Sequence, residues 1–248
     1  DNMRLTNEIC KICKREFERG KINVSSAGTL LSFMEKPNFK MSFGFAQYCA
    51  EGNLCGDTIK TINDSRGHMV FIISDGMGKG SRAALDGAMG AGLLSKLLSA
   101  GFGFDSSLKV VNSALLVKSH EESLATLDCV RVDLFSGKCE FYKAGAPRSY
   151  IVKDDRLTKC ELTSMPAGIL RGVEFAKRTT VLNTDDEIIM MSDGVTDVGN
   201  EWLEKFLRLD TALDPNEKAK AILKIALENS DEKHRDDMSV IVAKMLER

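Results

Sequence analysis

The tripeptide Ser-Asp-Gly occurs twice in the chain, each time directly after an apolar run. It stands at residues 74–76 after the run 70–73, and at residues 192–194 after the run 188–191. Short continuous apolar runs are typical of strands buried on both faces, and the glycine frees the backbone to turn where the strand ends. Each motif therefore predicts an aspartate at the end of a buried strand.

Two further acidic positions are similar. Asp57 stands just ahead of an expected strand, and Asp236 and Asp237 lead into the last one. A single Asp-Gly pair is an ordinary turn, but four strand ends can meet if the strands share one sandwich. Converging carboxylates such as Asp57, Asp75, Asp193 and Asp236 repel one another unless a cation lies among them. We therefore expect a metal site at these strand ends.

The ligand types select the metal. Carboxylate, carbonyl and water oxygens suit Mg²⁺ or Mn²⁺ rather than Zn²⁺, and of His68, His120 and His234 only the last lies near these acids in the sequence. Two such ions about 3.5–4 Å apart generate a nucleophilic hydroxide and hold the oxygens of an in-line phosphoryl displacement. The pattern thus favours hydrolysis of a phosphate ester without a nucleophilic side chain.

Residues 75–81, Asp-Gly-Met-Gly-Lys-Gly-Ser, form a glycine-rich segment ahead of an expected helix. The segment is not a P-loop, because glycine rather than Ser or Thr follows the lysine, and it lacks the last step of G-x-G-x-x-G. Two interpretations remain, a tight strand-to-helix turn or a loop whose N–H groups approach a phosphate or a metal-bound anion. The preceding aspartate favours the second.

Hydrophobic periodicity predicts the elements that carry these residues. Helical groups lie before and after a β-rich centre, an order that fits an α+β fold with helices outside two antiparallel sheets. The expected helices are 4–19, 81–98, 106–118 and one beginning at Asp214-Pro215, and the expected strands lie near 41–45, 70–73, 130–134, 139–144, 148–153, 157–162, 174–182, 186–192 and 238–245. Glycines 87, 90 and 92 predict close approach of another element to the second helix.

Composition excludes several classes of protein. The 248 residues carry 34 basic and 36 acidic side chains, so no electrostatic attraction to nucleic acid is expected. No apolar run approaches the roughly 20 residues of a membrane span, and no secretory signal opens the chain. Seven scattered cysteines, of which only Cys10 and Cys13 form C-x-x-C, indicate free thiols in a reducing cytoplasm.

The order of the motifs resembles a known family. G-D at 56–57, S-D-G-M-G-K-G at 74–80, S-D-G at 192–194 and D-D-M-S-V at 236–240 are similar to the bacterial branch of the PPM (type 2C) metal-dependent protein phosphatases, and S-D-G-M-G-x-G to its sporulation stage II protein E group. The resemblance covers about residues 38–246. It includes A-T-L-D at 125–128, A-G-A-P at 144–147 and M-P-A-G-I at 165–169.

The resemblance implies a four-layer α/β/β/α sandwich with two Mn²⁺ or Mg²⁺ ions in a cleft at the strand ends. It also implies hydrolysis of phosphoserine or phosphothreonine on a protein. By motif, Asp75 would bridge both ions, the Gly76 carbonyl would bind one, Asp193 and Asp236 would complete the second, Asp57 would hold metal-bound water, and Asp237 would support Asp236.

The sporulation group further implies a substrate, the phosphorylated anti-anti-sigma factor, whose dephosphorylation activates a sporulation sigma factor. It implies a longer protein with a membrane region and this domain on the cytoplasmic side, and a first residue other than Met fits such a truncation. Three alternatives remain open. The first is a stress-response partner-switching phosphatase, although members of that group usually show D-x-S-G-H-G, and the second is a non-catalytic binding module. The third is a histidine-kinase-type ATP-binding domain, which would need the motif D-x-G-x-G, whereas residue 77 of this chain is Met.

Two features depart from the family pattern. Cys55 precedes Gly56-Asp57 where serine is usual, and no Arg near Asp57 matches the one that holds the substrate phosphate in eukaryotic relatives. We expect residues 37–248 to form the phosphatase domain. Residues 1–36 are expected to form a helical linker or regulatory arm, which packs on its own domain, couples to upstream sequence or forms a homodimer contact.

Overall fold

The computed structural model describes residues 2–50, 52, 54–64, 66–78, 80–118, 124–154, 156–172, 175–199, 201–209, 213–232 and 235–248. His120, His234 and Lys79, which the sequence analysis names, lie outside these residues. The chain divides into two compact units, residues 1–38 with Arg248, and residues 39–247. In the described part of the chain, no helix is both long and apolar enough to cross a bilayer.

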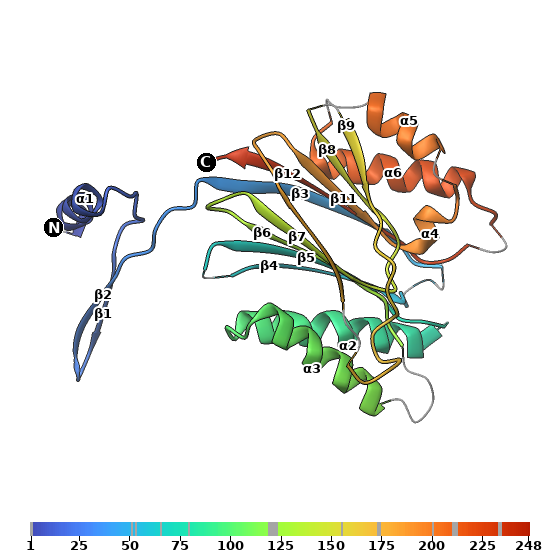
Figure 1. Ribbon diagram of the computed structural model, residues 1–248, viewed down its shortest axis with the longest axis horizontal. Coiled ribbons are helices and arrows are strands. Elements are labelled where there is room, and N and C mark those ends of the chain that lie inside the picture. The colour runs from blue at the N-terminus through green and yellow to red at the C-terminus, as the bar shows by residue number, and fades with distance from the viewer. Residues whose placement is uncertain are drawn as a thin grey trace. The chain divides into compact units, whose positions relative to one another are not determined.

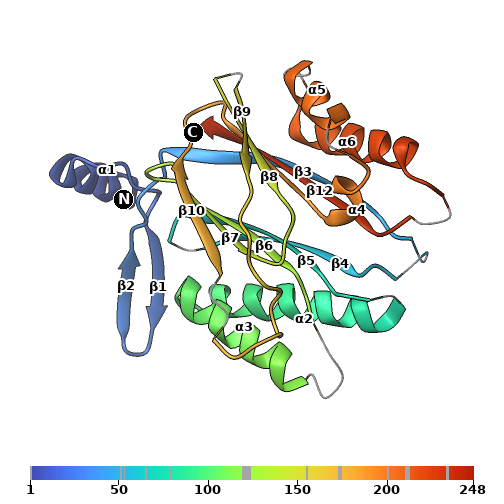
Figure 2. The ribbon, with the colours of Figure 1, turned by 45° about the vertical axis from the view of Figure 1, so that its right-hand side comes forward.

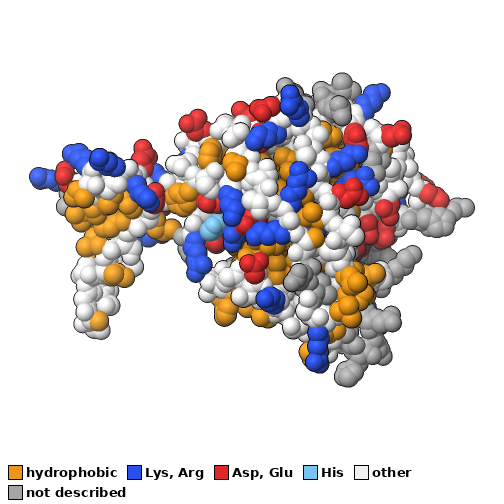
Figure 3. Space-filling view, in the orientation of Figure 1, with side chains coloured by type: hydrophobic (Ala, Val, Ile, Leu, Met, Phe, Trp, Pro, Cys, Tyr) orange, Lys and Arg blue, Asp and Glu red, His pale blue; other side chains and the backbone are white. Residues whose placement is uncertain are grey.

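The first unit contains a short helix and an exposed hairpin. Helix α1 (Asn2–Cys13) is followed by β1 (Lys21–Ser25) and β2 (Gly28–Ser32), which pair antiparallel. The expectation of a helix to residue 19 is wrong. The backbone turns at Lys14, where φ is 53°, and Phe17 forms a bridge with Glu35. Figure 3 shows hydrophobic side chains on the surface of this unit, among them Ile12, Val24 and Leu30.

The second unit is a sandwich of two five-stranded antiparallel sheets (Figure 1). One sheet has the order β10-β7-β6-β5-β4 and the other β3-β12-β11-β8-β9. The strands are β3 (Phe39–Tyr48), β4 (Asp57–Asn63), β5 (His68–Asp75), β6 (Leu127–Asp133), β7 (Lys138–Ala144), β8 (Ser149–Lys153), β9 (Arg156–Cys160), β10 (Ala176–Val181), β11 (Glu187–Met191) and β12 (Met238–Glu247).

Helices cover the outer face of each sheet, as Figures 1 and 2 show. Helices α2 (Gly80–Ser99) and α3 (Phe104–Lys118) pack on the first sheet, and α5 (Glu201–Leu209) and α6 (Pro215–Asn229) pack on the second. Helix α6 begins as expected, since the Asp214 carboxylate accepts the N–H groups of Asn216 and Glu217. The α+β, four-layer expectation is confirmed. Helix α5 and the short helix α4 (Asp193–Thr196) were not foreseen.

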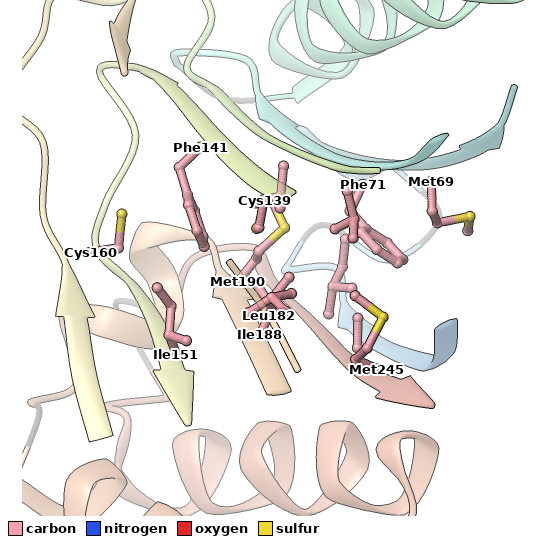
Figure 4. Packing of buried hydrophobic residues seen from close by; sticks show 14 of the residues in the cluster. Met69, Phe71, Cys139, Phe141, Ile151, Cys160, Leu182, Ile188, Met190 and Met245 are labelled. Atoms are coloured by element: carbon pink, nitrogen blue, oxygen red, sulfur yellow. The ribbon is translucent and has the colours of Figure 1, made fainter. Parts of the chain in front are cut away.

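The sheets enclose a core of their own, shown in Figure 4. Phe71 and Phe141 from the first sheet meet Met190 and Met245 from the second. The neighbours of Phe71 in β5 turn outward, where Ile72 packs under α2 and α3. Strand β5 is therefore buried on both faces, as its unbroken apolar run predicts, and it holds its terminal aspartate on rigid structure.

Of the glycines at 87, 90 and 92 in α2, two allow the close approach that the sequence predicts. A Cβ on Gly87 would lie 2.2 Å from the Gly56 carbonyl oxygen, and one on Gly90 would lie 2.9 Å from the Ser74 hydroxyl. The expectation is wrong for Gly92, around which no described atom lies within 4 Å of such a Cβ. Helix α2 thus packs against the ends of β4 and β5, where the acidic motifs lie.

Candidate metal centre

The first two aspartates of the predicted site lie opposite one another in the first sheet. Asp57 opens β4 and Asp75 closes β5, and their Cα atoms are register partners in the antiparallel pair. The backbone is fixed on both sides of the pair, since the Gly76 N–H donates to the Gly56 carbonyl at 3.2 Å. The sequence analysis predicts both strand ends, and the structure brings them to the same sheet edge.

The other sheet supplies the second pair of motifs. Asp193 begins α4 directly after β11, and Asp236 and Asp237 precede β12, the neighbour of β11. The Ser192 N–H donates to the Ser239 carbonyl at 3.0 Å, and the Ser239 N–H donates to the Ser192 hydroxyl at 2.9 Å. These reciprocal bonds hold the two motifs side by side.

Asp57 is a buried carboxylate without hydrogen-bond partners. Its side chain belongs to a residue only 4% exposed, and neither carboxylate oxygen has a partner among the described residues. Burial raises its pKa to about 6, against the lowering effect of the nearby Ser192 and Ser239 hydroxyls. An ionised carboxylate in such a place is costly unless a cation or a proton accompanies it.

Asp75 has the most strongly raised pKa of the candidate acids, about 8. Burial is the largest cause, and the charges of Asp57, Asp193, Asp236 and Asp237 follow. Burial also raises the pKa of Asp193, with Asp236 and Asp197 adding to it. The other four expected acids therefore all lie close enough to Asp75 to act on its pKa, and the structure brings the five together at the meeting point of the two sheets.

These oxygens fit a hard divalent cation. Carboxylate oxygens without partners are the donors that Mg²⁺ and Mn²⁺ prefer. Within the described residues, however, no three His, Cys, Asp or Glu side chains already form a closed ligand set. An ion here would complete its shell with water or backbone carbonyls, which is usual for Mg²⁺.

Asp237 has a different environment from its neighbour. Its Oδ1 accepts the Ala50 N–H at 2.7 Å, and its Oδ2 accepts the Gly56 N–H. Both oxygens thus anchor the segment between β3 and β4, and this segment leads into Asp57. The bonds favour a supporting rather than a ligating role for Asp237.

Cys55 lies in the anchored segment. Its thiol is 4.0 Å from the Tyr48 carbonyl oxygen, and burial, followed by its contact with Cys49, raises its pKa. The thiol is therefore protonated at neutral pH. It is therefore a weak hydrogen-bond donor.

In the glycine-rich segment after Asp75, two backbone N–H groups are used in hydrogen bonds within the fold and are not free to bind an anion. The Gly76 N–H donates to the Gly56 carbonyl and the Met77 N–H to the Leu124 carbonyl at 3.0 Å. The expectation of a phosphate-facing loop is therefore wrong for these two amides, which fasten the strand end instead. A Cβ on Gly76 would lie 1.9 Å from the Ala83 carbonyl oxygen, so α2 packs directly against it.

A groove of about 550 Å³ opens beside the acidic cluster, which we call the Arg148 groove. Its walls are residues 145–148 and 161–164, and Asp193, Thr196, Asp197 and Gly199 complete the lining. Arg148 was not among the predicted site residues, because an arginine was expected only near Asp57. The position of Arg148 directly after A-G-A-P was the signal that could have found it.

The sequence analysis also missed a buried ion pair behind this groove. Lys143 is inaccessible to solvent and donates to Asp128 at 2.7 Å, to the Ser149 hydroxyl at 2.8 Å and to the Pro147 carbonyl at 2.6 Å. Asp128 and Lys143 are in β6 and β7 of the first sheet, whereas Ser149 opens β8 of the second. The pair therefore ties the two sheets together at the wall of the groove.

Comparisons with known proteins agree with this geometry. Residues 65–246 match the family model of Stage II sporulation protein E (SpoIIE). The chain is 28% identical over 222 residues to stage II sporulation protein E of Bacillus subtilis (strain 168), covering 87% of this chain and 27% of that protein. It is 31% identical over 200 residues to that of Priestia megaterium, covering 78% and 34%. The chain thus spans about a third or less of these relatives.

Solved structures share the fold. The PP2C phosphatase domain of SpoIIE from Bacillus subtilis, with a fragment of its regulatory domain, has a TM-score of 0.82 at 25% identity and covers 100% of this chain and 75% of that one. The catalytic domain of the phosphatase PstP in complex with 2 manganese ions has a TM-score of 0.67 at 18% identity, covering 84% and 100%. With its family match over most of its length and the acidic motifs at the expected strand ends, this chain belongs to the stage II sporulation protein E (SpoIIE) family.

Proposed function

We propose that this chain is a metal-dependent protein serine phosphatase domain. The observation that carries the proposal is the group of aspartates at the meeting point of the sheets, above all Asp57, whose two oxygens are buried without partners. Family membership supports the same activity, since the similar structure from Bacillus subtilis SpoIIE is a PP2C phosphatase domain. Two bound Mn²⁺ or Mg²⁺ ions would supply Lewis-acid activation of water and of the phosphoryl oxygens.

In this proposal the Asp75 carboxylate and the Gly76 carbonyl would help to hold the two ions, which would activate water and the phosphoryl oxygens when bound. Asp193 and Asp236 hold the second ion, and Asp57 orients the water that attacks phosphorus. Packing of α2 on Gly76 and Gly87 fixes the backbone of the first sheet edge. The reciprocal bonds between Ser192 and Ser239 do the same for the second. The carboxylates are thus held in place by rigid strand ends before substrate binds.

Asp237 acts differently in this proposal. Because its oxygens accept the Ala50 and Gly56 N–H groups, it holds the segment before Asp57 in position. Asp237 is therefore a positioning residue, and its replacement by Asn should retain part of the activity, since an amide oxygen still accepts one of the two bonds.

The substrate that we propose is a phosphorylated anti-anti-sigma factor, whose dephosphorylation would activate a sporulation sigma factor. Membership of the family supports this choice. We further propose that the domain acts on the cytoplasmic side within a longer, membrane-anchored protein, and that α1 contributes a dimer contact. The exposed apolar side chains of Met3, Leu5 and Ile12 support the contact.

Release of phosphate from a phosphoserine protein tests the activity. We expect turnover with Mn²⁺, loss of turnover with a chelator, and a severe defect in Asp75→Asn and Asp193→Asn, each folded as judged by circular dichroism. The matched control is Asp105→Asn on the exposed side of α3, which should behave as the parent. Full activity of both site variants without metal would refute the mechanism.

The choice of substrate needs a second measurement. The anti-anti-sigma factor of the sporulation pathway should be turned over faster than the equivalent protein of a stress-response partner-switching module. The reverse order would favour the stress-response alternative.

A further inference from the structure

The Arg148 groove shares a residue with the candidate metal centre. Asp193 lines the groove, and the carboxylate of Asp193 also acts on the pKa of Asp75. A protein segment whose phosphoserine reaches the acidic cluster therefore has this groove beside it. Its lining decides which neighbouring residues of the substrate fit.

The walls of the groove are held rigidly. The Ser164 hydroxyl donates to the Lys143 carbonyl at 2.8 Å and accepts the Gly145 N–H at 3.2 Å, which fastens one wall to the other. The buried Lys143 ammonium holds the Pro147 carbonyl at 2.6 Å. Because Pro147 directly precedes Arg148, the backbone from which the guanidinium extends is fixed before anything binds.

Arg148 is the one cationic side chain among the described residues that line the groove. It is only 28% exposed, and its Nη2 lies 3.7 Å from Glu161 Oε1, whose side chain is 64% exposed. Such a long ion pair with an exposed partner contributes little to stability. Glu161 is therefore easily displaced by another carboxylate, and Arg148 can exchange partners without a large loss.

The guanidinium faces the 161–164 wall of the groove, where its ion-pair partner Glu161 lies. Its charge acts on the buried Tyr150, where it opposes the pKa rise that burial causes. Arg148 is thus placed to contact a substrate side chain beside the phosphoserine.

We propose that Arg148 is a specificity-determining residue that binds an acidic side chain flanking the phosphoserine of the protein substrate. The inference rests on the proposed phosphatase function and adds a substrate class to it. A guanidinium can hold a carboxylate through two parallel N–H donors, a geometry that a lysine does not offer. The bond replaces the weak contact with Glu161 when the substrate segment enters the groove.

The test compares the full chain and its Arg148→Ala variant on three substrates. Two of the substrates are a pair of phosphoserine peptides that differ only at one residue beside the phosphoserine, which is Glu in one peptide and Gln in the other. The pair is made for each flanking position in turn. The third substrate is p-nitrophenyl phosphate, which has no flanking residue. We expect the parent to prefer one Glu peptide, and Arg148→Ala to lose about tenfold in kcat/KM on it, mainly through KM. Turnover of the Gln peptide and of p-nitrophenyl phosphate should stay within about twofold.

Matched variants separate charge from packing. Arg156→Ala removes an exposed arginine at the opposite end of the β8–β9 hairpin and should leave the Glu preference intact. Arg148→Lys should retain part of the preference, and Arg148→Glu should prefer a peptide with Lys at the flanking position. Reversal of the preference by a reversed charge is an outcome that a purely structural role of Arg148 would not produce.

Two results would overturn the inference. One is an unchanged Glu preference in Arg148→Ala, and the other is an equal loss on p-nitrophenyl phosphate, which would place the guanidinium on the phosphoryl group. If the parent hydrolyses none of the substrates with Mn²⁺, the proposed function fails instead. Fluorescence anisotropy of the labelled Glu peptide then still reports whether Arg148→Ala weakens binding.

Discussion

Asp57 and Asp75 are register partners across β4 and β5, and each raises the electrostatic cost of ionising the other. A protein that served only stability would not place two acids opposite one another at a buried sheet edge. Replacing a proposed metal-binding residue should therefore raise the stability of the metal-free fold and lower the phosphatase activity.

Replacing Asp75 by Asn should stabilise the metal-free protein while abolishing turnover. The amide keeps the shape of the side chain but removes a group that must either take up a proton on folding or bear a charge beside Asp57 and Asp193. Thermal unfolding in the presence of chelator should show a higher midpoint for Asp75→Asn than for the parent, and Asp105→Asn should show no change. A lower midpoint for Asp75→Asn in chelator would contradict this account of the site.

The metal-free protein should lose stability as the pH rises from about 4 to about 8. Burial raises the pKa of Asp75 from its ordinary value of 3.8 to about 8, and that of Asp57 to about 6. The folded state therefore binds protons that the unfolded state has released, and this stabilisation is present below 3.8 and lost as the pH approaches 8. Urea midpoints across this range in chelator measure the slope.

Two controls identify the groups responsible. Asp75→Asn should flatten the slope above pH 6, where the raised pKa of Asp75 still keeps a proton on the folded state. Saturating Mn²⁺ should raise the midpoint most at high pH, because the ion binds the ionised carboxylates of the folded state. An identical slope in the parent and in Asp75→Asn would assign the pH dependence to other groups.

Gly87 and Gly92 of α2 offer a matched pair. A Cβ on Gly87 would lie 2.2 Å from the Gly56 carbonyl oxygen, whereas no described atom lies within 4 Å of one on Gly92. Gly87→Ala should therefore displace α2 from the edge that holds Asp57 and reduce both stability and activity. Gly92→Ala should raise stability by about 0.5–1 kcal/mol, since alanine favours a helix. Equal effects of the two changes in urea unfolding would refute this packing.

Lys143 and Asp128 should show strong coupling. Lys143→Met leaves the Asp128 carboxylate buried without its cation, and we expect a loss of about 3–5 kcal/mol in the free energy of unfolding. The double variant with Asp128→Leu should lose less than Lys143→Met alone, because no unpaired charge remains. A double-mutant cycle by urea unfolding measures the coupling, and simple additivity would contradict it.

Removing residues 1–36 tests the proposed role of the N-terminal unit. Met3, Leu5 and Ile12 of α1 expose apolar surface. We therefore expect the truncated chain to have a lower association state than the full chain in sedimentation, or a different phosphatase rate. The sandwich has three hydrophobic clusters of its own and should keep its circular dichroism spectrum. If neither association state nor rate changes, the regulatory and dimer interpretations both fail.

The boundaries of an element could be predicted from the sequence where a single hydrophobic pattern ran through the whole element. Strand β5 ends at Asp75 as predicted, because an unbroken apolar run buried on both faces leaves little freedom in its boundaries. Helix α1 ended early, since its apolar repeat continued past Cys13 while the backbone turned at Lys14. The amides of Gly76 and Met77 were misassigned because their acceptors, Gly56 and Leu124, are distant along the chain.

Arg148 and Lys143 were missed for a related reason. Their contacts come from β6, β8 and the segment 161–164. The spacing of residues within a short stretch of sequence does not reveal neighbours that other strands supply. The acidic motifs could be recognised because glycine and serine mark the turn at each strand end. Lys143 lies inside β7 without such a marker, and Arg148 is marked only by the A-G-A-P segment that precedes it.

The carboxylate of Asp237 joins two amides that lie 187 and 181 residues earlier in the chain. Strand β12, which follows it, lies between β3 and β11 and completes the second sheet. During synthesis the nascent chain therefore carries Asp57, Asp75 and Asp193 long before the segment that fixes their relative positions has left the ribosome. A chain that stops before β12 lacks both hydrogen bonds of Asp237 and the strand between β3 and β11, so the candidate metal centre is complete only when this C-terminal strand is in place.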